Sequence, residues 1–199
     1  MKTAKTALIS VFDKNGIVEF AQGLTLLGWR ILASGGTAKR LSEAGIDVTD
    51  VATIVGEPIL GHRVVTLSRE VHAALLAKDT PEDNAELARL GIPRIDLVCI
   101  DLYPLQTAIE ERRPYEEVIE MIDIGGPTLL RSAAKGGRIV VSRAQDRQTV
   151  LDMLLDTGVD PGCRMYLAGL AEETVSRYCS LSSQYLLKRS DENELHKHF

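Results

Sequence analysis

The sequence predicts an α/β protein of three layers, in which a mostly parallel central sheet lies between two layers of helices, with a helical segment at the C-terminus. Short apolar runs alternate with stretches of helical periodicity, which is typical of a parallel sheet covered on both faces. After Asp160 and Pro161 one continuous helical pattern replaces this alternation. The 199 residues, 45% of them hydrophobic, suffice for one such domain. We therefore expect an α/β domain over 1–160, a helical extension of it over 161–188 and a polar tail over 189–199.

Five short apolar runs are expected to form the strands of the sheet. The clearest is the unbroken run from Leu97 to Ile100, and runs of this kind suit strands that are buried on both faces. The expected strands are 6–12, 29–34, 48–54, 95–102 and 138–142.

Helices are expected between these strands, because apolar residues recur three and four positions apart there. Asp13 can cap the first helix, whose inner face carries Ile17 and Phe20. The segment 56–69 holds several helix breakers and is expected to be a loop. Further helices are expected near 37–44, 70–77, 81–90, 144–155 and 165–187.

The segment 122–135 joins a carboxylate, Asp123, to a glycine turn and the start of a helix. Pro127 fits the first helical position, where its missing N–H is not needed, and two helical turns follow. Three polar side chains then share one stripe of the helix, namely Thr128, Arg131 and Lys135. Such a helix either presents cations to an anionic substrate that needs a proton moved, or simply carries a solvated basic face.

Composition excludes several classes of function. A net charge of −5 argues against broad nucleic-acid binding, which needs a basic surface. The three cysteines are odd in number and widely spaced, so we expect neither a disulfide framework nor a metal site, and a reducing cytoplasm is the simplest compartment. No segment has the pattern of a signal peptide or a membrane span, so no membrane association is expected.

Candidate ligand-binding residues follow three of the expected strands. In open α/β sheets, ligands bind beyond the carboxyl ends of the strands. The candidates are Ser10, Phe12, Asp13 and Lys14 after the first strand, Ser34 to Thr37 after the second, and Asp101 to Pro104 after the fourth. We expect them to share one edge of the sheet, where the Asp123 turn can join them. Tyr103 can reach a ligand or finish the core, and Asp101 can bind a sugar or base or cap the next turn.

The segment from Ser34 to Thr37 has the composition of a phosphate cradle. Its glycines let backbone N–H groups approach closely, its hydroxyls donate, and the helix N-terminus adds partial positive charge. Lys14 would supply the counter-charge, and Arg63 and Thr66 can complete the cradle. The alternative is a tight strand-to-helix turn with a Ser or Thr cap.

Five blocks of residues occur in an order and spacing that carry a family resemblance. They are Ser10…Lys14, Ser34-Gly35-Gly36-Thr37-Ala38-Lys39, Arg63…Thr66-Leu67, Leu102-Tyr103-Pro104 and Ile122-Asp123-Ile124-Gly125-Gly126…Ala133-Ala134-Lys135. Over nearly the whole chain the sequence resembles the inosine monophosphate cyclohydrolase domain of the bifunctional purine-biosynthesis enzyme. The Gly-Gly block is shared with the wider methylglyoxal-synthase-like fold, which is therefore the fold implied. The family's second domain, a folate-dependent formyltransferase, is not matched, so a separate formyltransferase can supply the substrate.

The resemblance implies ring closure of formamido-imidazole-carboxamide ribonucleotide (FAICAR) to inosine monophosphate (IMP) and water, without a cofactor. Asp123, Tyr103 and Lys135 would surround the reacting ring, with Lys135 as proton donor and acceptor. The long C-terminal helix also suggests a homodimer. The substrate would be held by Ser10, Phe12, Asp13, Lys14, Ser34, Gly35, Gly36, Thr37, Arg63, Val65, Thr66, Asp101, Ile124 and Gly125.

The chain departs from the family pattern within the expected site. Phe12 replaces a serine, Val65 a lysine and Asp101 an asparagine, and the Ser68-Arg69 pair replaces His-Pro. Loss of the lysine matters most, because removing one group that stabilises developing charge costs on the order of 10²–10³ in rate. Arg69 can compensate only in part. Two alternatives therefore stay open: a diverged paralogue that acts on a related purine-like nucleotide in a specialised pathway, and a non-catalytic nucleotide-binding module.

Overall fold

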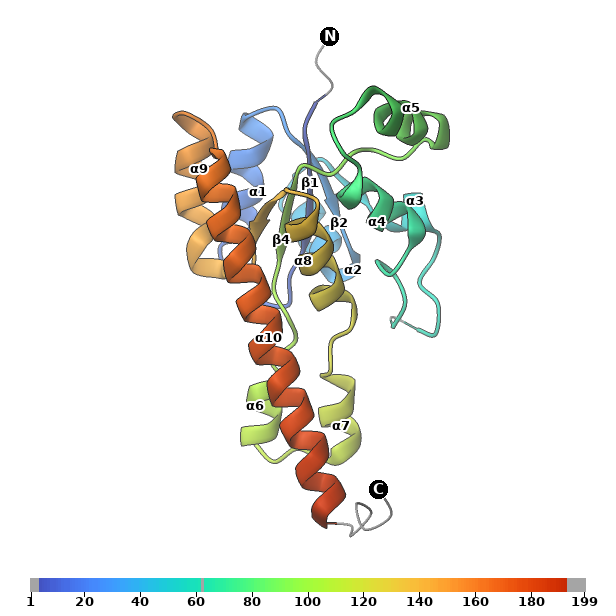
Figure 1. Ribbon diagram of the computed structural model, residues 1–199, viewed down its shortest axis with the longest axis vertical. Helices are drawn as coiled ribbons and strands as arrows, with labels where there is room; N and C mark the ends of the chain where they lie inside the picture. The colour runs from blue at the N-terminus through green and yellow to red at the C-terminus, as the bar shows by residue number, and fades with distance from the viewer. Residues whose placement is uncertain (1–3, 62, 193–199) are drawn as a thin grey trace.

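The computed structural model describes residues 4–61 and 63–192, and it places a five-stranded parallel sheet at the centre of the molecule (Figure 1). Every neighbouring pair of strands is parallel, as expected. In sheet order the strands are β3 (Val48–Asp50), β2 (Arg30–Ala33), β1 (Thr6–Ser10), β4 (Leu97–Ile100) and β5 (Ile139–Val141).

Helices follow the strands along the chain. They are α1 (Ile17–Leu26), α2 (Gly35–Glu43), α3 (Ala52–Val55), α4 (Arg69–Leu76), α5 (Pro81–Leu90), α6 (Leu105–Glu110), α7 (Tyr115–Glu120), α8 (Gly125–Lys135), α9 (Arg147–Leu155) and α10 (Pro161–Glu192), with a 3₁₀ turn η1 at Ala144–Asp146.

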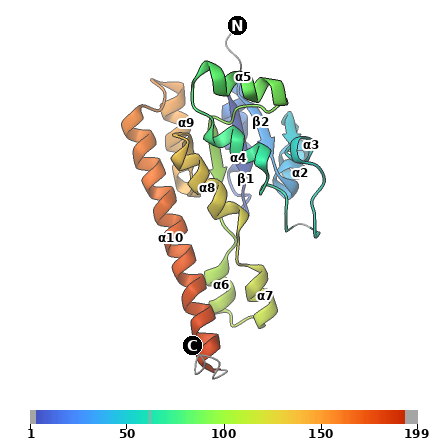
Figure 2. The same ribbon diagram turned by 45° about the vertical axis from the view of Figure 1, so that its right-hand side comes forward.

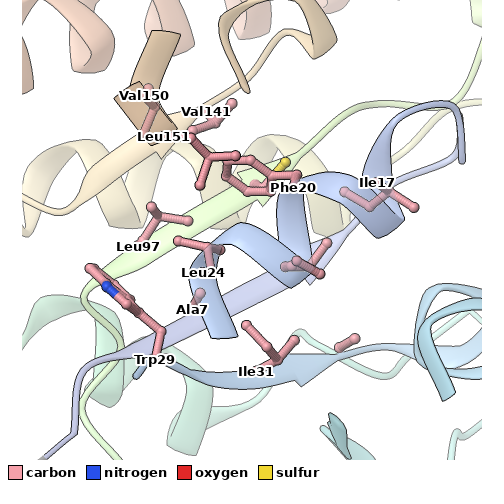
Figure 3. Packing of buried hydrophobic residues seen from close by; sticks show 14 of the residues in the cluster. Ala7, Ile17, Phe20, Leu24, Trp29, Ile31, Leu97, Val141, Val150 and Leu151 are labelled. Carbon is pink, nitrogen blue, oxygen red and sulfur yellow. The ribbon is translucent and has the colours of Figure 1, made fainter. Parts of the chain in front are cut away.

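Strands β1, β2, β4 and β5 are largely buried on both faces because their side chains alternate between two apolar layers, whereas the edge strand β3 is partly exposed. On one face, Ala7 and Ile9 of β1 pack with α1, α2 and α9, as Figure 3 shows for Phe20 and Leu151. On the other face, Leu8 packs with α4, α5 and α8. The three layers expected from the sequence are therefore present.

Helix α10 runs along the β5 edge of the sheet and continues past it, beside α6 (Figures 1 and 2). Its residue Leu167 belongs to one core layer, while Ala171 and Val175 belong to the other. Asp160 accepts the N–H groups of Gly162 and Cys163, so the helix begins at Pro161, earlier than expected. Residues 189–192 of the expected polar tail are helical, and 193–199 lie outside the described residues.

Local side-chain hydrogen bonds explain two wrong expectations, one about where a strand ends and one about which residue caps a helix. The strand expected over 48–54 ends at Asp50, whose carboxylate accepts the Ala52 N–H at 2.9 Å and thereby starts the short helix α3. Asp13 does not cap α1. Its carboxylate accepts the Asn15 N–H at 3.0 Å, and the left-handed backbone of Gly16 leads into the helix instead.

Helix α8 also starts earlier than expected. Its first residue is Gly125, so Pro127 is the third helical residue rather than the first. The Asp123 carboxylate accepts the Gly126 N–H at 2.9 Å and supports this earlier start. Helices α6 and α7 were not expected at all, since each is only six residues long and shows little periodicity. None of the described helices combines the length and the hydropathy needed to cross a bilayer.

Candidate functional site

A cavity of about 470 Å³, here called the rim pocket, opens at the carboxyl ends of the central strands. In the parallel register Ser10 pairs with Ile100 and Ile9 with Ala33, so β1, β2 and β4 end at one level. Of the residues expected to hold or transform a ligand, the rim pocket is lined by Ser10, Phe12, Lys14, Ser34, Gly35, Gly36, Thr37, Arg63, Val65, Thr66, Asp101, Tyr103, Asp123, Ile124 and Gly125. Asp13 and Lys135 do not line it.

The N-terminus of α2 forms one wall of the rim pocket. Ser34 precedes the helix with its side chain free of any capping bond, and its hydroxyl lies 2.7 Å from that of Ser10. Gly35 has a φ of 44°, and a Cβ built on Gly35 or Gly36 meets nothing within 4 Å, so the backbone here is open to a ligand. Two hydroxyls and a helix N-terminus together suit an anion such as a phosphate monoester.

Thr37 differs from the expectation for the cradle. Its side chain is buried, and its hydroxyl donates to the Val11 carbonyl at 3.1 Å and accepts the Val11 N–H at 3.2 Å. The hydroxyl therefore ties the end of β1 to α2 and is not available to a ligand. The sequence does not reveal this bond, because 26 residues separate its two partners.

Lys14 supplies a cation at the same wall. Its ammonium donates to the carbonyls of Val11 and Phe12, which turn the chain around it. Burial lowers the pKa of the Lys14 ammonium, and the carboxylates of Asp101 and Asp13 oppose that shift. The cation is therefore held in place by the loop itself.

Asp101 neither binds the next turn nor faces the ligand space freely, which were the two roles expected for it. Its carboxylate accepts the N–H groups of Phe12 and Asp13, the latter at 3.2 Å. It also lies 3.6 Å from the guanidinium of Arg147, the first residue of α9. Burial raises the pKa of Asp101, while the two N–H bonds and Arg147 lower it. Burial has the larger effect, so these partners offset the extra negative charge at this position only in part.

Arg147 is a functional candidate that the sequence did not indicate. Only 5% of the residue is exposed, and it donates to the Asn15 carbonyl at 2.5 Å as well as facing Asp101. Its Nε is buried and has no hydrogen-bond partner among the described residues. Arg147 therefore links α9 to the loop that carries Phe12 and Lys14. It lies 46 positions from Asp101 in the sequence, so no local pattern could have paired them.

Asp123 and Tyr103 lie at another wall of the rim pocket. The Asp123 carboxylate accepts N–H groups of Gly126, Tyr103 and Gly125, but burial still raises its pKa. Burial and the Asp123 charge raise the pKa of Tyr103 as well, so this hydroxyl stays protonated at neutral pH. A Cβ on Gly126 would lie 2.5 Å from the Asp123 carboxylate, which explains the glycine.

The remaining walls are largely apolar. The Phe12 and Tyr103 rings meet edge to face at 5.8 Å, and Val65 lines the pocket where the family resemblance expects a lysine. Arg69 does not compensate, because it is exposed on α4, pairs with Glu70 and does not line the pocket. Ser68 caps that helix by accepting the Val71 N–H at 3.1 Å.

Arg63 reaches the rim pocket from the 56–68 loop but is already paired. Its guanidinium lies 3.2 Å from the carboxylate of Glu120, the last residue of α7, and both side chains are largely exposed. An exposed pair of this kind contributes little stability, about 0–1 kcal/mol, so an anionic ligand can compete for Arg63. Sequence reasoning missed Glu120 because it missed α7.

Lys135 lies in a different hollow. A groove of about 930 Å³ between α8 and α10, here called the α8–α10 groove, is lined by Thr128, Arg131 and Lys135 together with residues of α10 such as Tyr178. The three polar residues do share one stripe, as predicted, but that stripe faces α10 and not the rim pocket. Among the residues that the structure describes, the two hollows share only Ile122, Asp123 and Ile124. Within one chain, therefore, the structure does not bring Lys135 together with Tyr103.

Comparison with known proteins gives consistent results. Residues 16–128 match the family model of the MGS-like domain. Two relatives are each named bifunctional purine biosynthesis protein PurH. The one from Deinococcus deserti is 42% identical over 191 residues, which is 94% of this chain and 37% of the relative. The one from Persephonella marina is 45% identical over 158 residues, which is 77% of this chain and 31% of the relative. The chain thus spans about a third of the length of these relatives.

A solved structure is similar over almost its full length. The crystal structure of ForH superposes with a TM-score of 0.76 at 35% sequence identity, covering 91% of this chain and 98% of that one.

The Asp101–Arg147 pair predicts a stability effect. Arg147→Met keeps much of the side-chain volume but leaves the Asp101 carboxylate without its counter-charge, so it should lower the free energy of unfolding by about 3 kcal/mol. Adding Asp101→Asn should restore more than half of that loss, as measured by urea denaturation at pH 7. Losses of the two single variants that merely add would show that the residues do not interact.

The same variants should differ in the pH dependence of stability. Burial raises the pKa of Asp101 in the folded protein above its value in the unfolded chain. Between these two pKa values the folded protein binds more protons than the unfolded chain, so stability falls as pH rises through that interval. Arg147→Met removes a charge that lowers this pKa, so the fall should extend to higher pH, and the double variant should lose this contribution.

Proposed function

The chain belongs to the MGS-like domain family, and from this premise we propose that it closes the second ring of a purine nucleotide, converting FAICAR into IMP and water. The observation that carries the proposal is the rim pocket, where an anion cradle and the Asp123–Tyr103 pair line a single cavity. The relatives named as purine biosynthesis proteins support it. No cofactor is required for this chemistry.

The phosphate monoester would bind at the N-terminus of α2. Ser10, Ser34 and the backbone of Gly35 and Gly36 would donate hydrogen bonds, and Lys14 would balance the charge. The ligand's phosphate or ribose would displace Glu120 from Arg63. This anchoring holds the ring-forming atoms near Asp123 and reduces the entropy lost in ring closure.

Ring closure with loss of water moves two protons from nitrogen to oxygen, one during the attack and one during the dehydration. The carboxamide nitrogen attacks the formyl carbon, an N–C bond forms, and the formyl C=O becomes a C–O single bond. Asp123 would take the proton from nitrogen, a role that its raised pKa favours, and the Tyr103 hydroxyl would donate to the developing oxyanion. The C–O bond of the resulting carbinolamine then breaks. The formamido nitrogen gives up its proton, the oxygen takes up this second proton and leaves as water, and the ring gains its C=N bond.

A second candidate function follows from the apolar ring end of the rim pocket. Of the described side chains that line the pocket, only Lys14 and Arg63 are cationic, and Val65 adds no donor to the reacting groups. Phe12, packed on Tyr103, makes the same region drier. These features favour a diverged enzyme for a related purine-like nucleotide, or a module that binds such a nucleotide without turnover.

The proposal predicts that the purified protein forms IMP from FAICAR, followed by ultraviolet absorbance. Asp123→Asn should abolish turnover and leave nucleotide binding, measured by calorimetry, within a few-fold of wild type. Because the base must be ionised and burial raises its pKa, the wild-type rate should rise with pH through a value above that of an ordinary carboxylate. The exposed Asp47→Asn is the matched control. Binding without IMP formation would favour the second candidate, and an absence of binding would exclude both.

Val65 predicts a gain of function. Val65→Lys should raise turnover of FAICAR by about tenfold or more, because it restores a donor near the developing charge. Val65→Met, whose side chain is about as long as that of lysine but carries no charge, should not raise turnover. If the lysine variant gains nothing over the methionine variant, the site has been rebuilt for another ring.

We also propose a homodimer in which Lys135 of one copy reaches the rim pocket of the other and carries the second proton to the leaving oxygen. Lys135 is exposed, makes no ion pair with any described residue, and opens on the α8–α10 groove rather than on its own rim pocket. Large apolar side chains are exposed around that groove, including Ile124 at 61% and Leu187 at 64%, and a second copy would cover them.

This arrangement predicts complementation. Lys135→Ala alone should lose turnover while keeping binding, and Asp123→Asn alone should do the same. Co-refolded mixtures should regain about a quarter of wild-type activity, because half of the dimers then hold one intact site of two in a two-fold interface. A mixture as inactive as its parents would place Lys135 outside a shared site.

A further inference from the structure

The turn that presents Asp123 is held from outside by a residue of α10. The Tyr178 hydroxyl accepts the backbone N–H of Asp123 at 2.9 Å and donates to the backbone carbonyl of Met121. Both groups belong to the four-residue connection between α7 and α8. One hydroxyl therefore satisfies a donor and an acceptor of the same turn, 55 residues away in the sequence.

Asp123 is consequently held through both its side chain and its backbone. Its side chain accepts the Gly126 N–H at the start of α8, and its backbone N–H is bound by Tyr178. A Cβ at Gly126 would lie 2.5 Å from the Asp123 carboxylate, so the glycine is what lets the carboxylate lie against the start of the helix. Loss of the backbone bond would free the turn to move and carry the carboxylate with it.

Tyr178 is itself well anchored. Its ring packs on the cluster formed by Leu105, Ala108 and Val118 of α6 and α7. Burial raises its pKa to about 12, so the hydroxyl keeps the proton that it donates to Met121 at neutral pH. Ring and hydroxyl together fasten α10 to the segment that leads into α8.

We propose that Tyr178 is a positioning residue that fixes Asp123 in the rim pocket, so that α10 is part of the site although it lies beyond the matched segment 16–128. This positioning role concerns only the structure of the turn. Its consequence for catalysis rests on the proposed function, in which Asp123 is the base.

Tyr178→Phe tests the proposal, because it removes the hydroxyl and keeps the ring in the cluster. Tyr185→Phe is the matched control, since Tyr185 lies on the same helix, packs on the same cluster and makes no hydrogen bond through its hydroxyl with any described residue. Hydrogen exchange followed by NMR in the ligand-free protein should show the Asp123 amide protected in wild type. Its exchange should be about tenfold faster in Tyr178→Phe and unchanged in Tyr185→Phe.

Kinetic measurements provide a second test, because kcat and its pH dependence would not change if Tyr178 only stabilised the fold. In Tyr178→Phe, kcat should fall between about tenfold and about a hundredfold with little change in KM, because the reacting carboxylate is misplaced. The acidic limb of the pH profile should also move to higher pH, since the N–H bonds that lower the Asp123 pKa weaken. Tyr185→Phe should change neither quantity.

The outcomes separate the two proposals. An unprotected Asp123 amide in wild type, or equal exchange and an unmoved acidic limb in both variants, would overturn the role of Tyr178. Faster exchange in Tyr178→Phe alone, in a protein that never forms IMP, would support the positioning role and overturn the proposed activity.

Discussion

The rim pocket depends on one constraint: three neighbouring parallel strands end at the same level of the sheet. Because β1 pairs in register with both β2 and β4, Ser10, Ser34 and Asp101 leave the sheet side by side. The 2.7 Å approach of the Ser10 and Ser34 hydroxyls and the bonds from Phe12 and Asp13 to Asp101 follow from that register. A slip of β1 against its two neighbours would separate these groups.

The three carboxylates among the described residues that line the rim pocket are each already engaged, which is compatible with the proposed binding of an anion. Asp101 is engaged by Arg147 and two backbone N–H groups. Glu120 is paired with Arg63, and Asp123 accepts N–H groups at the start of α8. The Arg63–Glu120 pair joins two largely exposed side chains and contributes little stability, so the proposed ligand would gain Arg63 at small cost while the other two carboxylates keep their positions. The charge pattern thus separates a fixed framework from one replaceable contact.

Sequence reasoning succeeded where the signal was local. Apolar runs located all five strands, and helical periodicity predicted Pro81–Leu90 with its observed bounds. In the structure Thr80 caps the start of this helix and Gly91 follows its end. Glycines and hydroxyls indicated the wall formed by α2. It failed where one side chain settles a boundary, as Asp50 does, and where helices are too short to show a period, as α6 and α7 are. Arg147 and Tyr178 escaped because their partners are brought close only by the fold, and the direction in which Lys135 faces depends on how α8 packs on α10.

The central claim is that the rim pocket binds a purine-type ribonucleotide by its phosphate monoester. A crystal structure with IMP bound tests it most directly. The account predicts the phosphate at the N-terminus of α2, within hydrogen-bond distance of Ser34 and the Gly35–Gly36 backbone, and the base beside Tyr103 and Asp123. A nucleotide seated in the α8–α10 groove, or with its phosphate away from α2, would contradict it.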